Sequence, residues 1–457
     1  MTGKRKTLWV GGGLLLVALL IFFAVRQGPK PVTIRMIGEA YAPLDALAKM
    51  KGEFEQKTGI HVEIIEKDHQ AVVAELDQEL SSRKVTYDLI LMPHRLLGKL
   101  VEKGQVQPLE SFFGDPSLHD PTFKPEDQLF TTWWREIGWY KGKLYGFPFT
   151  DLTMYVCYRK DLMGDPKERQ AFRARFGRDP APPKTWSEYM DLAQFYNRPK
   201  QNMYGTYIQG QQHVALWYEW LNLAYSFGGN ILDSPHGSEY GDIVVNSPEN
   251  VKATEQYLKL LDYSPPESVN YNWDDALAVL QQGRVFMGIL WHDQTPLLED
   301  GSVSKVVGKM GYSLIPSAIG KPFSQLEGWA YLIPTESKHP REAYRLIEWA
   351  LSPDVQIRQT LKGGASARKA TYNDPRVKAI PYVPVFLESV PIAIPKPTVP
   401  ESEQITEIMQ KALSEIVTRK RSPQDGLNAM ALEIQRILGA KAKMRFALTP
   451  DAGSPRQ

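Results

Sequence analysis

The chain has 457 residues, which is too long for one compact core and predicts two or three domains. Its 54 lysines and arginines nearly balance its 52 aspartates and glutamates, so the composition gives no electrostatic footprint for nucleic acid or for an anionic surface. The single cysteine, Cys157, lies in an apolar run and excludes both a disulfide framework within the chain and a cysteine metal cluster. We interpret it as a buried structural thiol.

The N-terminal segment predicts export. A basic cluster at 4–6 precedes an uncharged stretch at 8–25, and the positive-inside rule keeps the basic cluster cytoplasmic while everything after Arg26 is exported. The stretch is longer than a signal-peptide core of about 7–15 residues and close to the lower limit for spanning a bilayer, about 17–25 residues. Residues 1–31 are therefore expected to be a cleaved signal peptide or an uncleaved inner-membrane anchor, followed by a linker.

From residue 32 onward the chain alternates strand and helix patterns. Nearly every residue at 32–38 is apolar or β-branched, as expected for a strand that is covered on both faces. An amphipathic helix follows at 45–58 and ends before a glycine, and two more strand–helix pairs occupy 61–104. This order predicts a parallel sheet wrapped by helices.

Parallel sheets bind ligands outside the carboxyl ends of their strands. That rule points to Glu39 and Tyr41 after the first strand, and to His94 and Arg95 after the third. The alternatives are that Glu39 is an ordinary solvated loop residue and that Arg95 caps a neighbouring helix.

The rest of the chain changes composition at 111–146, which is rich in proline, aspartate and aromatic residues and leads into a strand. Such a change suggests a crossing between lobes. Beyond it, 184–264 is predicted to be helical, and the last dozen residues are expected to be disordered. The other predicted elements are a helix at 273–283, strands at 284–291, 309–316 and 327–334, and helices at 339–351, 402–419 and 425–438.

Six segments, taken in order, resemble maltose-binding-like solute-binding proteins, the extracellular sugar-binding components of bacterial ABC importers. The resemblance covers 32 to about 440 and rests on the order of the segments. One departure is Arg159, which stands where the family usually has asparagine. The segments are FEQKTGIHVEI, YDLILMPHRLLGKLVEKGQVQPL, GKLYGFPFTDLTMYVCYRKDL, PKTWSEYMDLA, EGWAYLIPTESKHPREAYRLIEWALSPDVQ and GGASARKATYNDP.

The resemblance implies the type II periplasmic-binding-protein fold, in which two α/β lobes joined by crossover hinge strands close on a solute in the cleft between them. It places lobe one at 32–149 plus 330–372, lobe two at 150–329 plus 373–440, and a disordered tail at 441–457.

A sugar site needs flat aromatic platforms and hydrogen-bonding carboxylates, amides or arginines. Trp291 ends a predicted strand, in a loop where the family often carries a stacking tryptophan. Gly328 and Trp329 match the end of the family's Gly-Gly-Trp, and Glu327 replaces its first glycine. The alternative for each tryptophan is a place in the core. Trp217 is a weaker candidate because, like Trp273, it lies at helical spacing among apolar residues.

The resemblance also implies roles for four polar or charged residues. Asp151 lies one residue before the family's crossover carboxylate and is expected to replace it. Arg368 matches an arginine that binds sugar hydroxyls in several members, and its forked guanidinium suits vicinal diols; a surface salt bridge is the alternative. His94 and Arg95 occupy the place of an acidic sugar-contacting residue, which implies a differently decorated solute.

The chain has no zinc-protease motif, phosphate-binding loop or nucleophile elbow, so neither a metal, a cofactor nor an enzymatic activity is expected. The main hypothesis is a periplasmic or otherwise extracytoplasmic ABC-transporter protein that binds a carbohydrate or polyol and presents it to permease subunits. Three alternatives remain: a sensor accessory on the same fold, a polyamine- or iron-binding protein, and a glycan-active hydrolase with Glu39 and Asp151 as its carboxylates.

Overall fold

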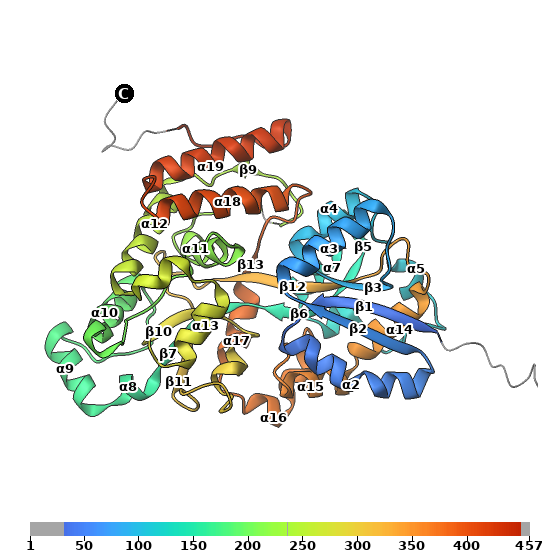
Figure 1. Ribbon diagram of the computed structural model, residues 1–457, viewed down its shortest axis with the longest axis horizontal. Coiled ribbons are helices and arrows are strands. Elements are labelled where there is room, and N and C mark those ends of the chain that lie inside the picture. The colour runs from blue at the N-terminus through green and yellow to red at the C-terminus, as the bar shows by residue number, and fades with distance from the viewer. Residues whose placement is uncertain (1–31, 235, 449–457) are drawn as a thin grey trace, which may run out of the picture.

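The computed structural model describes residues 32–448 with the exception of residue 235. The chain forms two lobes side by side, and strands run from one lobe toward the other (Figure 1). The first lobe is built on a six-stranded sheet and the second on a three-stranded sheet. The predicted two-lobed α/β fold is thereby confirmed, whereas the residue bounds of the lobes stay a prediction.

The sheet of the first lobe begins as the sequence predicts. Strand β1 pairs in parallel with both β2 and β3. Gly59 follows the first helix in the left-handed conformation, with φ 71°, which glycine adopts without steric cost. The elements are β1 (Thr33–Glu39), α2 (Ala42–Thr58), β2 (His61–Lys67), α3 (His69–Ser82), β3 (Leu89–Pro93) and α4 (Leu97–Glu102).

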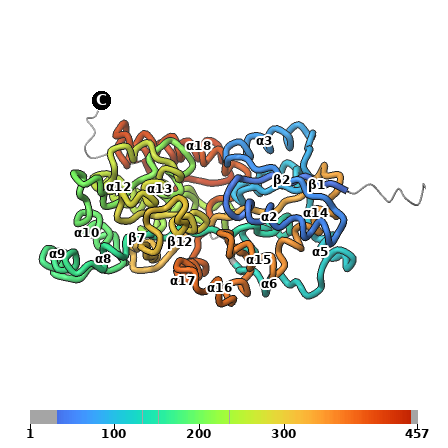
Figure 2. The backbone as a smooth tube through the Cα atoms, turned by 60° about the horizontal axis from the view of Figure 1, so that its bottom comes forward, coloured from blue at the N-terminus to red at the C-terminus, as the bar shows by residue number. Residues whose placement is uncertain are grey.

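Strand β12 (Ser324–Leu332) joins the two lobes (Figure 2). All nine of its residues are buried. Its second half pairs antiparallel with β3 and with β6 (Gly146–Leu152), and its first three residues pair in parallel with β13 (Ala393–Pro395). The strand predicted at 327–334 is confirmed and begins three residues earlier.

The second lobe contains the antiparallel sheet β10–β7–β11. Its strands are β7 (Met154–Arg159), β10 (Met287–Trp291) and β11 (Met310–Ser313). Cys157 is fully buried in β7, and burial raises the pKa of its thiol, so the interpretation as a structural thiol is confirmed. Among its described residues, region 184–264, predicted to be helical, holds three α-helices but also a small pair of strands, β8 (Leu232–Asp233) and β9 (Asp242–Ile243).

The remaining helices and strands cover the sheets. In the first lobe they are α5 (Glu110–Phe113), α6 (Pro125–Gln128), α7 (Thr131–Gly138), β4 (Trp139–Tyr140), β5 (Lys143–Leu144), α14 (Pro340–Ala350) and α15 (Pro353–Leu361). Elsewhere they are α8 (Lys160–Gly164), α9 (Pro166–Phe176), α10 (Trp186–Tyr196), α11 (Val214–Ser226), α12 (Pro248–Leu260), α13 (Trp273–Gln281), α16 (Pro375–Lys378), α17 (Val383–Ser389), α18 (Ser402–Val417) and α19 (Pro423–Leu438). One short 3-10 turn is used below, η1 (His94–Leu96).

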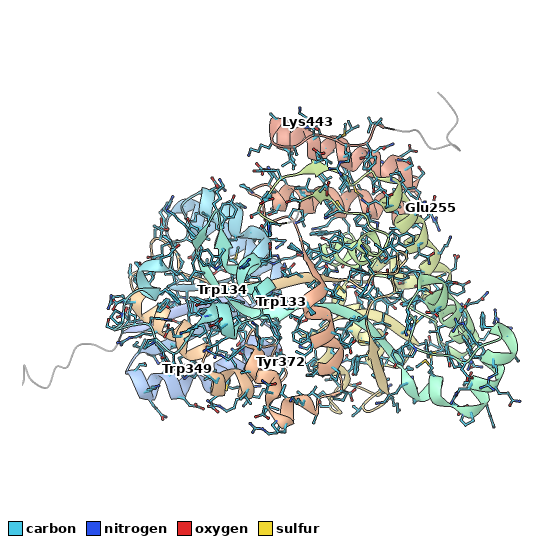
Figure 3. All side chains as sticks on the ribbon, turned by 180° about the vertical axis from the view of Figure 1, so that it is seen from behind. Trp133, Trp134, Glu255, Trp349, Tyr372 and Lys443 are labelled. Atoms are coloured by element: carbon cyan, nitrogen blue, oxygen red, sulfur yellow. The ribbon has the colours of Figure 1, made fainter. Side chains whose placement is uncertain are left out.

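Helix α7 packs against the crossing strands from behind. Trp133 and Trp134 lie near the middle of the molecule in Figure 3 and are both buried. The indole Nε1 of Trp133 donates to the carbonyl oxygen of Glu327 over 3.2 Å, so this helix fixes the backbone of β12 where the two lobes meet.

Two predictions concern the chain ends. Part of the tail expected to be disordered lies against β9, where the amide of Ile243 donates to the carbonyl of Lys443 (Figure 3); residues 449–457 lie outside the described residues. The predicted anchor at 8–25 also lies outside them. Within the described residues, no helix is long and apolar enough to cross a membrane.

Candidate functional site

A cavity of about 200 Å³ lies between the lobes where the strands cross. The first lobe contributes loop and helix-start residues, the second lobe contributes α11, α13 and the segment after β10, and the crossing strands supply the remainder. The lining residues are Glu39, Ala40, Tyr41, Ala42, His69, Pro93, Leu152, Tyr218, Trp273, Asp274, Leu277, Trp291, Asp293, Gln294, Leu297, Glu327 and Trp329.

The ends of neighbouring strands deliver the first-lobe side of the cavity. Glu39 ends β1 and Pro93 ends β3, while His69 opens the helix that follows β2. Because these strands are parallel, their carboxyl ends meet at one edge of the sheet. The cavity therefore lies at the edge that the strand order predicted.

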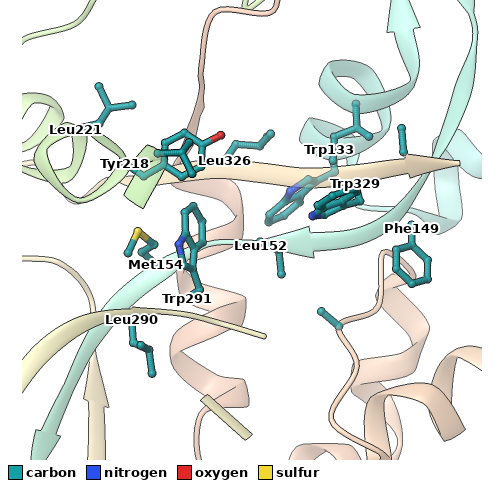
Figure 4. Close-up of a cluster of buried hydrophobic side chains, with 14 of the residues drawn as sticks. Trp133, Phe149, Leu152, Met154, Tyr218, Leu221, Leu290, Trp291, Leu326 and Trp329 are labelled. Carbon is teal, nitrogen blue, oxygen red and sulfur yellow. The ribbon is translucent and has the colours of Figure 1, made fainter. Parts of the chain in front are cut away.

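Aromatic rings form much of the cavity wall (Figure 4). The ring centroid of Trp329 lies 6.0 Å from that of Tyr41 and 5.4 Å from that of His69. On the second lobe, the centroids of Tyr218 and Trp291 are 5.7 Å apart in an edge-to-face arrangement. Flat faces therefore reach the cavity from both lobes.

A bulge in the crossing strands accompanies Trp329. The β12–β6 pairing shifts by one residue between Trp329 and Ala330, so Phe149 of β6 lies in the irregularity. Bulges bend a strand locally and re-aim the side chains beside them. Trp329 has only 3 % of its surface exposed, so neighbouring side chains and the closed cavity shield its ring from bulk solvent.

Glu39 and His69 form a polar pair on the first-lobe wall. His69 Nδ1 lies 3.1 Å from Glu39 Oε2. The other ring nitrogen, Nε2, is buried and has no hydrogen-bond partner among the described residues. The pair can thus offer a carboxylate acceptor and an imidazole nitrogen to a solute.

Glu327 lies in a buried charged cluster at the back of the cavity. Its Oε1 lies 2.8 Å from His94 Nδ1, and its Oε2 lies 3.0 Å from Lys396 Nζ. Although burial raises the pKa of the Glu327 carboxyl, the positive charge of Lys396, with His94, holds it well below the usual range. Glu327 is therefore an ionised acceptor at neutral pH.

Lys396 connects this cluster to the aromatic wall. It is fully buried, and its ammonium lies 4.2 Å from the ring centroid of Tyr218 and 5.3 Å from that of Trp291. Its Nζ also donates to Gln325 Oε1 and to the carbonyl of Leu326. Burial lowers the pKa of Lys396 to about 8, against the effect of Glu327, which raises it.

Two acidic residues belong to the second-lobe wall. Burial, followed by the negative charge of Glu39, raises the pKa of the Asp293 carboxyl to about 7. The pKa of Asp274 is raised by the same two causes in the same order, although this residue is more exposed. Asp293 Oδ1 is buried and has no hydrogen-bond partner in the described part of the chain.

The structure brings four of the predicted site residues together. Glu39, Tyr41, Trp291 and Trp329 line one cavity. Tyr41 also anchors the first lobe to β6, because its hydroxyl lies 3.2 Å from Thr150 Oγ1. Whether these residues bind a solute stays a prediction.

His94 and Arg95 lie behind the cavity in η1 rather than on its wall. His94 is fully buried and contacts Glu327 directly. Nε and Nη1 of Arg95 are buried without a hydrogen-bond partner among the described residues, and its charge helps to lower the pKa of Glu327. In this structure both residues support Glu327 instead of lining the cavity.

The structure places three of the other four predicted residues, Gly328, Trp217 and Arg368, away from the cavity wall. Gly328 is buried, and a Cβ there would lie 2.3 Å from Ile137 Cδ1, so its role is close packing. Trp217 packs edge-on against its neighbour Tyr218, which does line the cavity. Asp151 belongs to β6, and its backbone pairs with that of Gly328 in β12. The side chain of Asp151 lies outside the described part of the structure.

Arg368 lies in a different part of the first lobe. Its Nε donates to the carbonyl of Leu351, its Nη1 donates to Gln128 Oε1, and its guanidinium lies 5.0 Å from the Phe123 ring centroid. These contacts hold the side chain at a separate surface hollow. Sequence similarity located the segment, but contacts with the end of α14 and with α6 direct this arginine elsewhere.

A sequence profile of the bacterial extracellular solute-binding proteins matches residues 49–385. The chain belongs to this family. A probable ABC transporter-binding protein of Deinococcus radiodurans is 26 % identical over 93 % of this chain and 98 % of its own length.

Two solved structures show the fold of this solute-binding protein. An ABC transporter solute-binding protein from Thermotoga lettingae TMO, bound with α-D-tagatose, is 26 % identical with a TM-score of 0.76 and covers 89 % of this chain and 100 % of its own. Another from Agrobacterium radiobacter K84, in complex with ribitol, is 24 % identical with a TM-score of 0.77 and the same coverage. The predicted family and two-lobed fold are thereby confirmed.

Several residues of this solute-binding protein reach the cavity without having been predicted. His69 follows β2 of the parallel sheet, so the strand-end rule that selected Glu39 could have found it. Asp293 and Gln294 lie just beyond β10, which belongs to an antiparallel sheet, so that rule does not reach them. Trp273, a weaker candidate because of its helical spacing among apolar residues, lies half-buried on the cavity wall. Nothing in the local sequence marks Lys396, because Gln325 and Leu326 lie 71 and 70 residues earlier in the chain. They meet Lys396 only through the pairing of β12 with β13.

Proposed function

We propose that this protein captures a monosaccharide or a polyol between its lobes and delivers it to the permease subunits of an ABC importer. The observation that carries the proposal is the enclosure of Trp291 and Trp329 in one cavity with the carboxylates Glu39 and Glu327. Aromatic faces suit the weakly apolar C–H faces of a sugar, and carboxylates accept hydrogen bonds from its hydroxyls.

The size of the cavity favours a small solute. Pockets for drug-sized ligands have volumes of about 300–1,000 Å³, whereas a cavity of about 150 Å³ accommodates a single benzene ring. A cavity of about 200 Å³ therefore suits one sugar ring or a short open-chain polyol better than an oligosaccharide. The sizes of the tagatose and ribitol bound by the two similar proteins agree with this estimate.

Binding by this mechanism requires the lobes to move. Trp291 and Trp329 are almost fully buried, so a solute reaches the cavity only when the lobes part, and water is excluded when they close again. We assign the hinge to the crossing strands β6 and β12. The proposed lobes are those predicted from the sequence, 32–149 plus 330–372 and 150–329 plus 373–440.

Delivery of a solute to a permease implies that the protein is located outside the cytoplasm, in agreement with its extracellular solute-binding family. We keep both fates of the segment at 8–25, a removed signal peptide and an inner-membrane anchor, because the described residues do not include it. N-terminal sequencing of the exported protein distinguishes them, since a cleaved protein begins after the apolar stretch.

A ligand screen tests the proposal. Thermal shift against neutral monosaccharides, polyols and amino sugars, followed by calorimetric titration of each hit, is expected to identify at least one solute. One solute molecule should bind per chain. The solute should raise the free energy of unfolding of the protein as its concentration rises, by about 2.7 kcal/mol at a hundred times Kd. A panel in which no compound bound or stabilised the protein would contradict the proposal.

We propose no covalent chemistry at this site. Carboxylates in a closed cavity can hold sugar hydroxyls without cleaving a glycosidic bond, and a cavity of this size has little room for both sides of such a bond. Incubation with labelled oligosaccharides is expected to give no product; turnover that disappeared in Glu39→Gln would establish a hydrolase instead.

A further inference from the structure

The cavity has an unbalanced charge. No lysine or arginine is among the described residues that line it, whereas four carboxylates are: Glu39, Asp274, Asp293 and Glu327. Only Glu327 has an ammonium partner, because Lys396 lies 3.0 Å away behind the wall. Asp274 is partly exposed to solvent. The two enclosed carboxylates without a lysine or arginine partner are therefore Glu39 and Asp293.

These two carboxylates come from opposite lobes. Glu39 ends β1 in the first lobe, and Asp293 follows β10 in the second lobe. They are close enough for the charge of Glu39 to raise the pKa of Asp293. Glu39 contacts the imidazole of His69, and Asp293 Oδ1 is buried with no hydrogen-bond partner among the described residues.

Lobe closure therefore brings two negative charges toward each other in a place of low dielectric. Like charges in such a place repel strongly, and the repulsion opposes the closed form until a proton or another cation lies between them. A cation on the solute would remove this repulsion only when the solute is bound. The surrounding rings of Trp273, Trp329 and Tyr41 add faces that attract a cation.

We propose that the natural solute is an amino sugar or an amino polyol whose ammonium group lies between Glu39 and Asp293. This inference rests on the proposed function and narrows it. The hydroxyl-bearing carbon frame stacks on Trp291 and Trp329, and Glu327 accepts from its hydroxyls. The same charges disfavour uronic acids and sugar phosphates, since each would add a negative charge to an already acidic cavity.

Matched pairs of probes test the inference. Each pair shares one carbon frame and differs by one amine in place of a hydroxyl: sorbitol and glucamine, glucose and glucosamine, galactose and galactosamine. In titrations at about pH 7.5 and low salt, the amine of at least one pair is expected to bind about ten-fold or more tightly than its neutral partner.

Variants assign the preference to the two carboxylates. Asp293→Asn and Glu39→Gln are each expected to reduce the amine preference to less than about three-fold. Asp262→Asn, an exposed second-lobe substitution with the same change in net charge, should keep it. Far-ultraviolet circular dichroism and melting of each variant separate a lost preference from a lost fold, and either carboxylate variant alone is sufficient for the test.

The pH dependence gives an independent readout. Glu39, His69, Asp274, Tyr41 and Glu327 line the cavity with Asp293. Because Asp293 titrates near pH 7, glucamine should bind more weakly as the pH falls from about 8 to 6, and Asp293→Asn should flatten that dependence.

The outcomes separate the two proposals. A neutral partner that binds as tightly as its amine in every pair, or an amine preference that persists in Asp293→Asn and Glu39→Gln, would overturn this inference and leave the carbohydrate function intact. If no member of any pair bound, the function itself would be contradicted.

Discussion

Trp329 has two roles in the structure, one in the cavity wall and one in the core. It ends the part of β12 that faces the cavity, and its ring contacts Tyr41 and His69. It is both a wall of the cavity and part of a continuous buried strand. A substitution of Trp329 is therefore expected to affect both solute affinity and the free energy of unfolding, and the two effects can be compared.

Trp329→Leu should affect solute binding more than stability. The leucine keeps part of the apolar packing but removes the flat face, so we expect Kd to rise about ten-fold or more while the free energy of unfolding falls by about 2 kcal/mol. Calorimetric titration and urea unfolding measure the two effects. Trp349→Leu is the matched control, because this half-buried tryptophan packs on Phe54 outside the interlobe cavity; unchanged affinity in Trp329→Leu would return Trp329 to the core.

Lys396 is the residue whose removal should most disturb the apo protein. Lys396→Met leaves Glu327 ionised and buried without its ammonium partner, and breaking a buried pair in this way costs about 3–5 kcal/mol. The double variant Lys396→Met/Glu327→Gln should recover part of the loss, because the unpaired charge is gone. Urea unfolding of the single and double variants measures this coupling, and additive losses would show that the pair is not energetically connected.

At the scale of elements, the close approach of β12 and β6 depends on Gly328. A Cβ at this position would lie 2.3 Å from Ile137 Cδ1 and 2.6 Å from the carbonyl oxygen of Thr150, so Gly328→Ala must displace backbone. We expect a loss of about 1–3 kcal/mol in the free energy of unfolding.

Gly52→Ala in α2 is the control for that substitution. Nothing lies within 4 Å of the added Cβ, and the helical position should gain about 0.5–1 kcal/mol. Thermal unfolding of both variants gives the comparison. Equal effects at the two glycines would mean that the crossing strands tolerate more separation than their geometry indicates.

Local sequence patterns predict most helices and strands, because the spacing of apolar residues follows the buried face of each element. Strand β2 begins at the predicted residue 61, and α18 and α19 begin within two residues of their predicted starts. The parallel order of the first three strands also predicts which edge carries the site. By contrast, the contacts of Lys396 with Glu327 and Tyr218 depend on three segments that meet only in the fold. Arg368 shows the reverse case, in which a similar segment directs its side chain to Gln128 instead of the cavity.

At the scale of the whole molecule, a buried acid makes stability depend on pH. Burial raises the pKa of Glu219 to about 7, although Tyr257 and Gln209 donate hydrogen bonds to its carboxylate. Between about pH 4.5 and 7 the folded protein therefore holds a proton that the unfolded chain releases. The free energy of unfolding should fall as pH rises through this window and then level off, with Glu219 contributing on the order of 3 kcal/mol.

Glu219→Gln should flatten this dependence without abolishing it, because Asp293 also titrates near pH 7. Glu255→Gln, at an exposed position of α12 labelled in Figure 3, is the control and should keep the slope of the wild type. Urea unfolding at intervals of half a pH unit provides the measurement. A wild-type stability that rose steadily from about pH 5 to 7 would contradict the assignment.

The pairing of β12 has a consequence for biosynthesis. Strands β1, β2 and β3 are made first, but the edge of β3 that pairs with β12 stays open until residue 332 has been synthesised, and β13 completes the sheet only at residue 395. A chain synthesised in order thus exposes an unpaired edge until most of its residues have been made. The native sheet can therefore form only late in synthesis, and this open edge is the place where premature aggregation would begin.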